Sequence, residues 1–278
     1  MNALVSELEV TPGDKRKLQA RARRLAKRAE SLAGEGRFDE AIVYQAELVD
    51  LRPQDVGAAL RLGLLYREAR RIEAAVIELR RAAVLSPTLC DPREALIETL
   101  LDAAMYEETI SEGKALLKVS PRNVFARDVL SVAYLQLGLL EKALHMATEM
   151  VRFDPLNPGH HFKRALLLQQ AGNLSDAMTE YTRTRDLAMP ESELHSDARE
   201  ALEALDDYQL HQIMLLAAED WHFNHQLRSD PAGAIHTRGF TLSAEGLSRA
   251  YYMAQDDNPE LSAGQTMRTA WGGVRFYH

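Results

Sequence analysis

Prolines recur along this chain at a constant interval of 34 residues, at Pro53, Pro87, Pro121 and Pro155. A fifth, Pro190, follows one residue late. Because proline makes up only 10 of the 278 residues, chance rarely places three further prolines on the register set by the first. A period of this length is the signature of a structural repeat in which each unit stacks on the next. The chain is therefore predicted to be a repeat array.

Two more positions follow the same period and indicate what each unit is. A small residue recurs at Ala41, Ala75, Ala143 and Ala177, with Thr109 at the remaining step. Five residues earlier stand Gly36, Gly138 and Gly172, with Arg70 and Ala104 at the other two steps. Glycine ends a helix where the backbone turns left-handed, a small residue lets two helices approach closely, and proline stops a helix. Each unit is therefore predicted to be a hairpin of two helices.

These positions resemble the tetratricopeptide repeat (TPR), which carries Leu-Gly and Tyr in its first helix, Gly at the turn, and Ala and Pro in and after its second helix. The second unit matches best, with Leu62, Gly63, Tyr66, Ala75, Leu79, Ala82 and Pro87, and the fourth has Leu130, Tyr134, Gly138, Ala143 and Pro155. The third departs most, because Thr109 and Gly113 lie in its second helix, and we expect it to be looser or differently packed. The resemblance covers about residues 22–191. It implies an all-α, right-handed superhelical solenoid of five hairpins, with no catalytic residues to carry over.

The predicted domain organisation follows from this register. In order, we expect an N-terminal segment 1–16, five TPR hairpins over 17–191 with boundaries near 55, 89, 123 and 157, a capping helix 192–205, a small helical module 206–250 and a flexible tail 251–278.

Composition and charge restrict the function classes. The formal net charge of −8 opposes binding to nucleic acid and to anionic membranes, and no apolar run approaches the roughly 18 residues of a membrane span. The N-terminus lacks the basic-then-apolar pattern of a signal peptide. His222 and His225 are three residues apart, but no cysteine or spaced carboxylate completes a zinc pattern. We therefore expect a cytoplasmic, non-enzymatic protein with no metal and no cofactor.

A basic cluster near the N-terminus places eight charges in fourteen residues, at Lys15, Arg16, Lys17, Arg21, Arg23, Arg24, Lys27 and Arg28. Such a cluster suits nucleic acid or anionic lipid. An apolar stripe at helical spacing runs through it, however, and no aromatic residue is interleaved to stack on bases. We therefore interpret these residues as the solvated outer face of the first helix of the array.

The TPR resemblance also predicts which positions line a concave binding surface. In the family these are the second, fifth, ninth and twelfth of each hairpin, with the sixth and thirteenth at the side. The candidate peptide-binding groove consists of Leu60, Leu64, Glu94, Glu98, Asp102, Asp128, Val132, Leu135, Phe162 and Leu166. Some TPR domains bind a C-terminal carboxylate through Lys and Asn at these positions. Here the fifth and ninth positions are apolar or acidic, so that ligand class is not expected.

A mixed apolar and acidic groove predicts its ligand by complementarity. We expect an extended or helical peptide segment of a protein, with apolar anchors and at least one Lys or Arg. The alternative is that the carboxylates form an ordinary solvated face. Exposed ion pairs contribute only about 0.2–1 kcal/mol each, so apolar contacts must supply most of the affinity.

After Pro190 the 34-residue register fades. Glu191–Leu205 is predicted to be an amphipathic capping helix with an acidic exposed face, formed by Glu191, Glu193, Asp197, Glu200 and Glu203. Three short helices are predicted next, around a core that includes Trp221, Phe223, Leu227, Phe240 and Leu242. Asp230 and Ser243 are expected to cap two of these helices, and Gly239 to form the turn between them.

Residues 210–249 resemble the nitrile-hydratase-like leader segments of ribosomally made, modified peptides. The shared pattern is Ala217-x-x-Asp220-x-x-Phe223, Leu227-x-x-Asp230-Pro231-x-x-Ala234 and Gly239-Phe240-x-Leu242-Ser243. In that family the module is a handle for a modifying enzyme, which implies an alternative role as substrate or recruiter in peptide maturation. A further alternative is a self-associating structural repeat, in which the tail with Arg268, Trp271 and Arg275 docks in the groove of the same or another copy.

Overall fold

The computed structural model describes residues 12–255, and over that range the secondary structure is helical, without strands. The chain divides into two compact units, Met1–Ala143 and Leu144–His278, with the boundary inside one helix. No helix in the described range is long and apolar enough to span a membrane. The predicted docking of the tail concerns residues 256–278, which lie outside that range.

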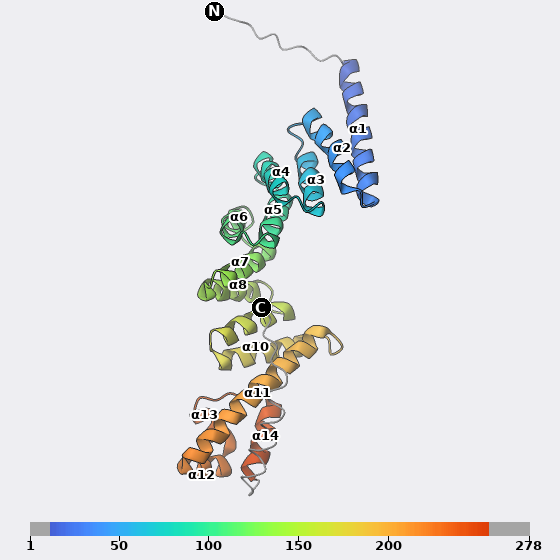
Figure 1. Ribbon diagram of the computed structural model, residues 1–278. Coiled ribbons are helices and arrows are strands. Elements are labelled where there is room, and N and C mark those ends of the chain that lie inside the picture. The colour runs from blue at the N-terminus through green and yellow to red at the C-terminus, as the bar shows by residue number, and fades with distance from the viewer. Residues whose placement is uncertain (1–11, 256–278) are drawn as a thin grey trace, which may run out of the picture. The chain divides into compact units, whose positions relative to one another are not determined.

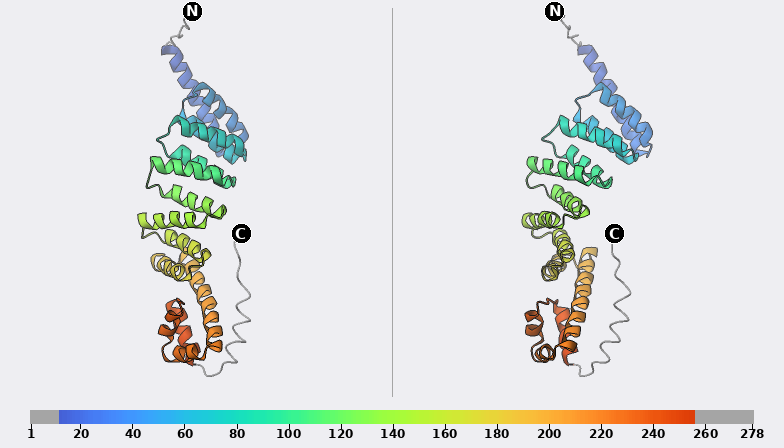
Figure 2. Two further views of the ribbon diagram at one scale, coloured as in Figure 1. Left: turned by 90° about the vertical axis from the view of Figure 1, so that its left-hand side faces the viewer. Right: turned by 60° about the vertical axis from the view of Figure 1, so that its left-hand side comes forward.

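The first unit consists of successive helical hairpins, as predicted from the 34-residue period (Figure 1). Its helices are α1 Pro12–Gly34, α2 Phe38–Leu51, α3 Val56–Glu68, α4 Ile72–Leu85, α5 Asp91–Asp102, α6 Tyr106–Val119, α7 Val124–Gln136 and the start of α8 Leu140–Phe153. Both views in Figure 2 show α1 to α6 stacked in chain order. The first hairpin is longer than expected, since α1 already begins at Pro12 rather than near residue 17.

The turn between the two helices of each hairpin requires a left-handed backbone. Gly36, Gly138 and Gly172 adopt φ values of 74°, 71° and 77°, as the sequence predicts. Arg70 and Ala104 stand at the same register and adopt φ values of 59° and 57°, although they carry a side chain. The turn is therefore imposed by the packing of the hairpin, and glycine only makes it easier to form.

Small residues allow the close approaches between these helices. A Cβ on Gly63 of α3 would lie 2.6 Å from Leu79 of α4, and a Cβ on Gly113 of α6 would lie 2.9 Å from Leu130 of α7. Thr109, which replaces the usual alanine, is fully buried, and its hydroxyl donates to the Met105 carbonyl oxygen at 2.9 Å. The third hairpin thus differs from its neighbours in burying a threonine at this position and in placing the glycine in its second helix, α6.

The second unit continues with two further hairpin helices and ends in a small module. Its helices are the rest of α8, then α9 Pro158–Gln170, α10 Leu174–Leu187, α11 Glu193–Glu219, α12 Trp221–Ser229, α13 Pro231–Thr237 and α14 Ala244–Gln255. The sequence predicts a break between a capping helix and the module after residue 205, whereas α11 runs through that point without a break. Its first half packs on α10, while α12, α13 and α14 gather along its second half (Figure 2). Residues 251–255, assigned to the tail, form the last turn of α14.

The module has a core of its own, centred on Phe223, which is fully buried. Leu227 is buried with it, and Phe240 and Leu242 are half-buried against the same cluster, in agreement with the expected core. Trp221 is a correction, because its side chain is 71% exposed and its ring stacks on His222, with 4.0 Å between ring centroids. Trp221 is the first residue of α12, and this position directs its side chain away from the buried face that Phe223 occupies.

The motif residues of the module have structural roles in this arrangement. Asp220 accepts from the Phe223 backbone N–H at 3.0 Å and caps α12, and Asp230 accepts from the Gly233 N–H at 3.0 Å and caps α13. The backbone hydrogen bond and the Arg238 guanidinium lower the pKa of Asp220. Ser243 caps α14 through its hydroxyl, which accepts from the Gly246 N–H at 3.0 Å. Gly239 is left-handed, with φ 81°, as predicted for the turn.

Candidate functional site

One pocket in the first unit gathers residues from the first helices of three successive hairpins, α3, α5 and α7. Its volume is about 500 Å³. The residues that line it are Arg67, Glu68, Arg70, Glu98, Leu101, Asp102, Phe125, Asp128 and Val129. All of them except Arg70 stand at the second, fifth, sixth, ninth, twelfth or thirteenth position of their hairpins. Three residues of the predicted groove, Glu98, Asp102 and Asp128, are therefore together in one place.

Local sequence sets where these helices begin. Asp55 accepts from the Ala58 N–H at 3.0 Å and caps α3, and Asn123 accepts from the Ala126 N–H at 2.7 Å and caps α7. Pro92 stands in the first turn of α5, where its missing N–H costs nothing. These residues set where the helices begin, and the acidic positions of α5 and α7 meet the basic end of α3 at the pocket.

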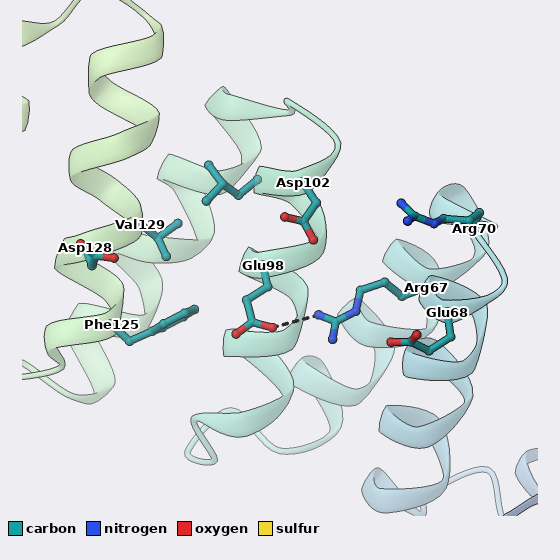
Figure 3. Close-up of a pocket in the computed structure, with 9 residues that line it drawn as sticks. Arg67, Glu68, Arg70, Glu98, Asp102, Phe125, Asp128 and Val129 are labelled. Atoms are coloured by element: carbon teal, nitrogen blue, oxygen red, sulfur yellow. Dashed lines mark hydrogen bonds and ion pairs between the residues drawn. The ribbon is translucent and has the colours of Figure 1, made fainter. Parts of the chain in front are cut away.

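The acidic side of the pocket is partly compensated by residues of the same chain. Glu98 of α5 accepts from Arg67 of α3, with 2.9 Å between Oε2 and Nη1 (Figure 3). The side chains of Arg67 and Glu98 are 26% and 48% exposed, so solvent weakens this ion pair. Glu94 is directed elsewhere, because its Oε1 accepts from the side-chain amide of Asn123 at 2.7 Å. Glu94 therefore supports the cap of α7 and does not line the pocket.

An aromatic ring and aliphatic groups provide the apolar part of the pocket. Figure 3 shows Phe125 reaching from α7 toward the helix that carries Glu98, with Val129 one turn further along α7. Leu101 lies on α5, between the acidic residues of that helix. Phe125 is half-buried, so part of its ring remains open to a ligand.

Other predicted groove residues of the first unit serve the packing between hairpins. Leu60 and Leu64 are half-buried against a core cluster that includes Leu79, Leu96 and Leu100. Val132 and Leu135 are also half-buried and lie outside the lining of the pocket. The structure thus supports a smaller apolar site than the sequence predicts.

Phe162 and Leu166 of the predicted groove belong to the second unit. Phe162 meets Tyr181 edge to face, with ring centroids 5.6 Å apart, and is half-buried in the cluster of α9 and α10. Leu166 is 48% exposed. Phe162 is therefore mainly a core residue, while Leu166 offers an apolar surface.

Arg67, Arg70 and Phe125 line the pocket although the predicted groove does not include them. The TPR register contained the signal for two of them, since Arg67 stands at a twelfth position and Phe125 at a second position. Arg70 lines the pocket from the turn after α3, where its left-handed backbone directs the side chain. Among residues 12–255, no group of three or more His, Cys, Asp or Glu residues is arranged to hold a metal ion.

Helical hairpins that repeat every 34 residues, with a pocket lined by their first helices, define a helical repeat of the tetratricopeptide class. Solved structures of that class are similar to it. A MamA RS-1 double mutant aligns with a TM-score of 0.55 and 17% identity, covering 60% of this chain and 94% of that chain. A truncated MamA from Desulfovibrio magneticus RS-1 gives a TM-score of 0.54 with 18% identity, over 60% and 94% of the two chains.

YrrB, described as a TPR protein with an unusual peptide-binding site, aligns with a TM-score of 0.52 and 15% identity, over 63% of this chain and 90% of that chain. At such identities the similarity concerns the fold. No family model matches the sequence, and no curated protein matches it.

Proposed function

We propose that this protein is an interaction scaffold without catalytic activity and that the pocket formed by α3, α5 and α7 binds a peptide segment of another protein. The observation that carries the proposal is the convergence of Glu98, Asp102 and Asp128 with the half-buried ring of Phe125 in one pocket. Carboxylates beside an aromatic ring suit a peptide that places Lys or Arg next to an apolar side chain. YrrB, with its peptide-binding site, is a precedent on a similar fold.

The distribution of charge gives the ligand a direction. Arg67 and Arg70 lie at the α3 side of the pocket, whereas Asp102 and Asp128 lie on α5 and α7. We infer that a ligand cation binds toward α5 and α7 and that carbonyl or carboxylate oxygens of the ligand face Arg70, because Arg67 is already paired with Glu98. Apolar contact with Phe125 supplies more of the affinity than the partly exposed charges do.

Selection from a displayed library of random peptides tests the proposal, with the full-length chain as bait. The first variant carries Glu98→Gln, Asp102→Asn and Asp128→Asn. Glu94 is left unchanged because its contact with Asn123 supports the start of α7. A matched control carries Glu73→Gln, Glu107→Gln and Glu141→Gln, which are exposed carboxylates at one register position of the second helices. Both variants change the net charge equally.

The expected result is enrichment of peptides that combine Lys or Arg with an aromatic or aliphatic residue. The pocket variant loses this enrichment and the control retains it. Binding of the selected peptides weakens with salt in the wild type, and its salt dependence becomes flatter in the pocket variant. Equal enrichment by all three proteins would contradict the proposal.

A second candidate function concerns the C-terminal module and rests on the exposed ring of Trp221, which the module's own core leaves in solvent. On this alternative the module is a handle for a peptide-modifying enzyme, and Trp221 is part of its contact surface. In a pull-down with the full chain as bait, the wild type and the pocket variant would then capture such an enzyme, and the Trp221→Ala variant would not. The reverse pattern would assign capture to the pocket.

A further inference from the structure

The first helix of the array carries arginine where later hairpins carry buried apolar residues. In steps of 34 residues, Arg24 corresponds to Ala58 and Ala126, and Arg28 corresponds to Leu62 and Leu96. All four of the corresponding residues are buried. Ala58 and Leu62 pack against the hairpin that precedes them, in a cluster with residues of α1 and α2. The arginine side of α1 is therefore the face on which another helix packs everywhere else in this unit.

That face is a basic pocket with an apolar floor. Its volume is about 640 Å³, and it is lined by Lys17, Arg21, Arg24, Leu25, Arg28 and Tyr44. The four basic residues are separated by four, three and four positions, so they form one stripe along α1. All four are exposed. We call these four residues the basic stripe.

Two of the four charges have partners within the first hairpin. Arg21 pairs with Glu47 of α2, and the guanidinium of Arg28 lies over the ring of Tyr44, 6.0 Å from its centroid. The Arg24 side chain donates from Nε to the Ala20 carbonyl oxygen at 3.4 Å. The stripe therefore keeps an excess of positive charge around a half-buried tyrosine, which favours an acidic helix as its occupant.

The same chain carries such a helix in its second unit. The first half of α11 buries Ala198, Leu202 and Leu205, and its opposite side exposes Glu193, Asp197, Glu200 and Glu203. Separations of four, three and three positions place these acidic residues along the exposed side. Arg199 is also exposed on this half of α11, four positions before Glu203 and at the edge of the acidic side. We call the four acidic residues the acidic stripe.

The two stripes match in length as well as in sign. At 1.5 Å per residue, the basic stripe is about 16 Å long and the acidic stripe is about 15 Å long. We propose that the acidic stripe of one copy of this chain docks on the basic stripe of a second copy, so that the protein self-associates. The contact joins different surfaces on the two partners, so each copy can contact two others, and the copies form closed rings or open chains. It is independent of the peptide pocket proposed above.

Sedimentation velocity and light scattering on the full chain test this proposal. Because the contact is electrostatic, the mean mass exceeds that of the monomer at about 20 mM salt and falls toward the monomer at about 300 mM. The basic-stripe variant carries Lys17→Gln, Arg24→Gln and Arg28→Gln, with Arg21 kept because it pairs with Glu47. The acidic-stripe variant carries Asp197→Asn, Glu200→Gln and Glu203→Gln. Each variant alone is expected to remain monomeric with an unchanged circular dichroism spectrum.

Mixing the two variants gives the sharpest test, because each retains one intact stripe. The mixture is expected to form a dimer and nothing larger. A further variant reverses the charges of both stripes, with Glu on α1 and Lys on α11. This variant is expected to associate as the wild type does, because the two stripes again carry opposite charges. Three results would overturn the proposal: a wild type that is monomeric at low salt, neutralised variants that associate as the wild type does, or a reversed chain that stays monomeric. Binding of single-stranded DNA by a monomeric wild type would assign the basic stripe to nucleic acid instead.

Discussion

Arg67 on α3 and Glu98 on α5 form an ion pair across the peptide pocket, with 2.9 Å between Nη1 and Oε2. The two residues belong to successive hairpins, at the twelfth and ninth positions of the repeat. Arg67 is therefore already paired with the Glu98 carboxylate, which a basic ligand would also contact (Figure 3). Any Lys or Arg of a ligand that approaches Glu98 competes with an arginine already in place.

Arg67→Gln is expected to strengthen the binding of basic peptides. The change removes a positive charge from the pocket and releases Glu98, so affinity for a Lys- or Arg-containing peptide should rise by about threefold to tenfold, or about 0.7–1.4 kcal/mol. Isothermal titration calorimetry with a peptide from the library selection measures this affinity. Arg80→Gln is the matched control, because Arg80 forms an exposed ion pair with Glu108 outside the pocket. Weaker binding by the Arg67 variant would mean that Arg67 itself contacts the ligand.

Ala104→Gly is expected to stabilise the first unit. Ala104 adopts φ 57° at the turn of the third hairpin, a left-handed conformation that costs a residue with a Cβ about 1–2 kcal/mol. Glycine removes that cost but gains entropy in the unfolded chain, so the net increase should be about 0.5 kcal/mol. The midpoint of urea unfolding should rise accordingly. Gly138→Ala, at the same register in the next hairpin, should lower the free energy of unfolding by about 1 kcal/mol.

Much of the fold could be predicted because the repeat records its geometry at fixed positions. Pro87 and Pro121 mark the ends of second helices, and Gly36 marks a turn, since each residue satisfies a backbone requirement that few others can. The same register predicts that Glu98 and Asp128 lie on one surface. Arg70 and Ala104 show the limit of this reasoning, because tertiary packing enforces the turn there against local preference.

Other features depend on contacts that no local pattern records. The pairing of Glu98 with Arg67 and of Glu94 with Asn123 joins residues about thirty positions apart, and each decides whether a carboxylate faces the pocket. The unbroken course of α11 also differs from the expectation. No proline or glycine interrupts residues 193–219, which favours one long helix, but the repeat register fades there and predicts a boundary. Trp221 is predicted to lie in the core of the module, whereas its place at the start of α12 leaves it exposed.

Glu180→Ala is expected to destabilise the second unit severely. Glu180 is 6% exposed, and its carboxylate joins Nδ1 of His161 at 2.7 Å and the guanidinium of Arg164. Removal of the carboxylate leaves two polar groups without their shared acceptor, at a cost of about 3 kcal/mol.

Asp186→Ala, on the same helix, is the control for Glu180. Asp186 pairs with the adjacent Arg185 and is 54% exposed, so its loss should cost less than about 0.5 kcal/mol. Urea unfolding followed by circular dichroism compares the two variants. Similar losses would show that the network around Glu180 contributes no more than a surface pair.

Asp206 is expected to give the attachment of α14 to α11 a dependence on pH. Asp206 is 2% exposed, its Oδ1 accepts from the Ser243 backbone N–H at 2.8 Å, and its other oxygen accepts from the Ser243 hydroxyl. Burial raises the pKa of Asp206, and the hydrogen bonds from Ser243 offset only part of that rise.

The sign of the effect follows from proton binding. Because the folded protein holds the proton of Asp206 more tightly than the unfolded chain, the contribution of Asp206 to stability is complete below its ordinary pKa of 3.8 and is lost as pH rises through the higher folded value. Asp206→Asn removes this titration while an amide can still pair with Ser243. The stability of the wild type relative to the Asp206→Asn variant should therefore be greater at about pH 4 than at about pH 7. Urea unfolding of both proteins at the two pH values measures this difference, and a wild type that gains on the variant as pH rises would show that the charged carboxylate is the favoured form at this site.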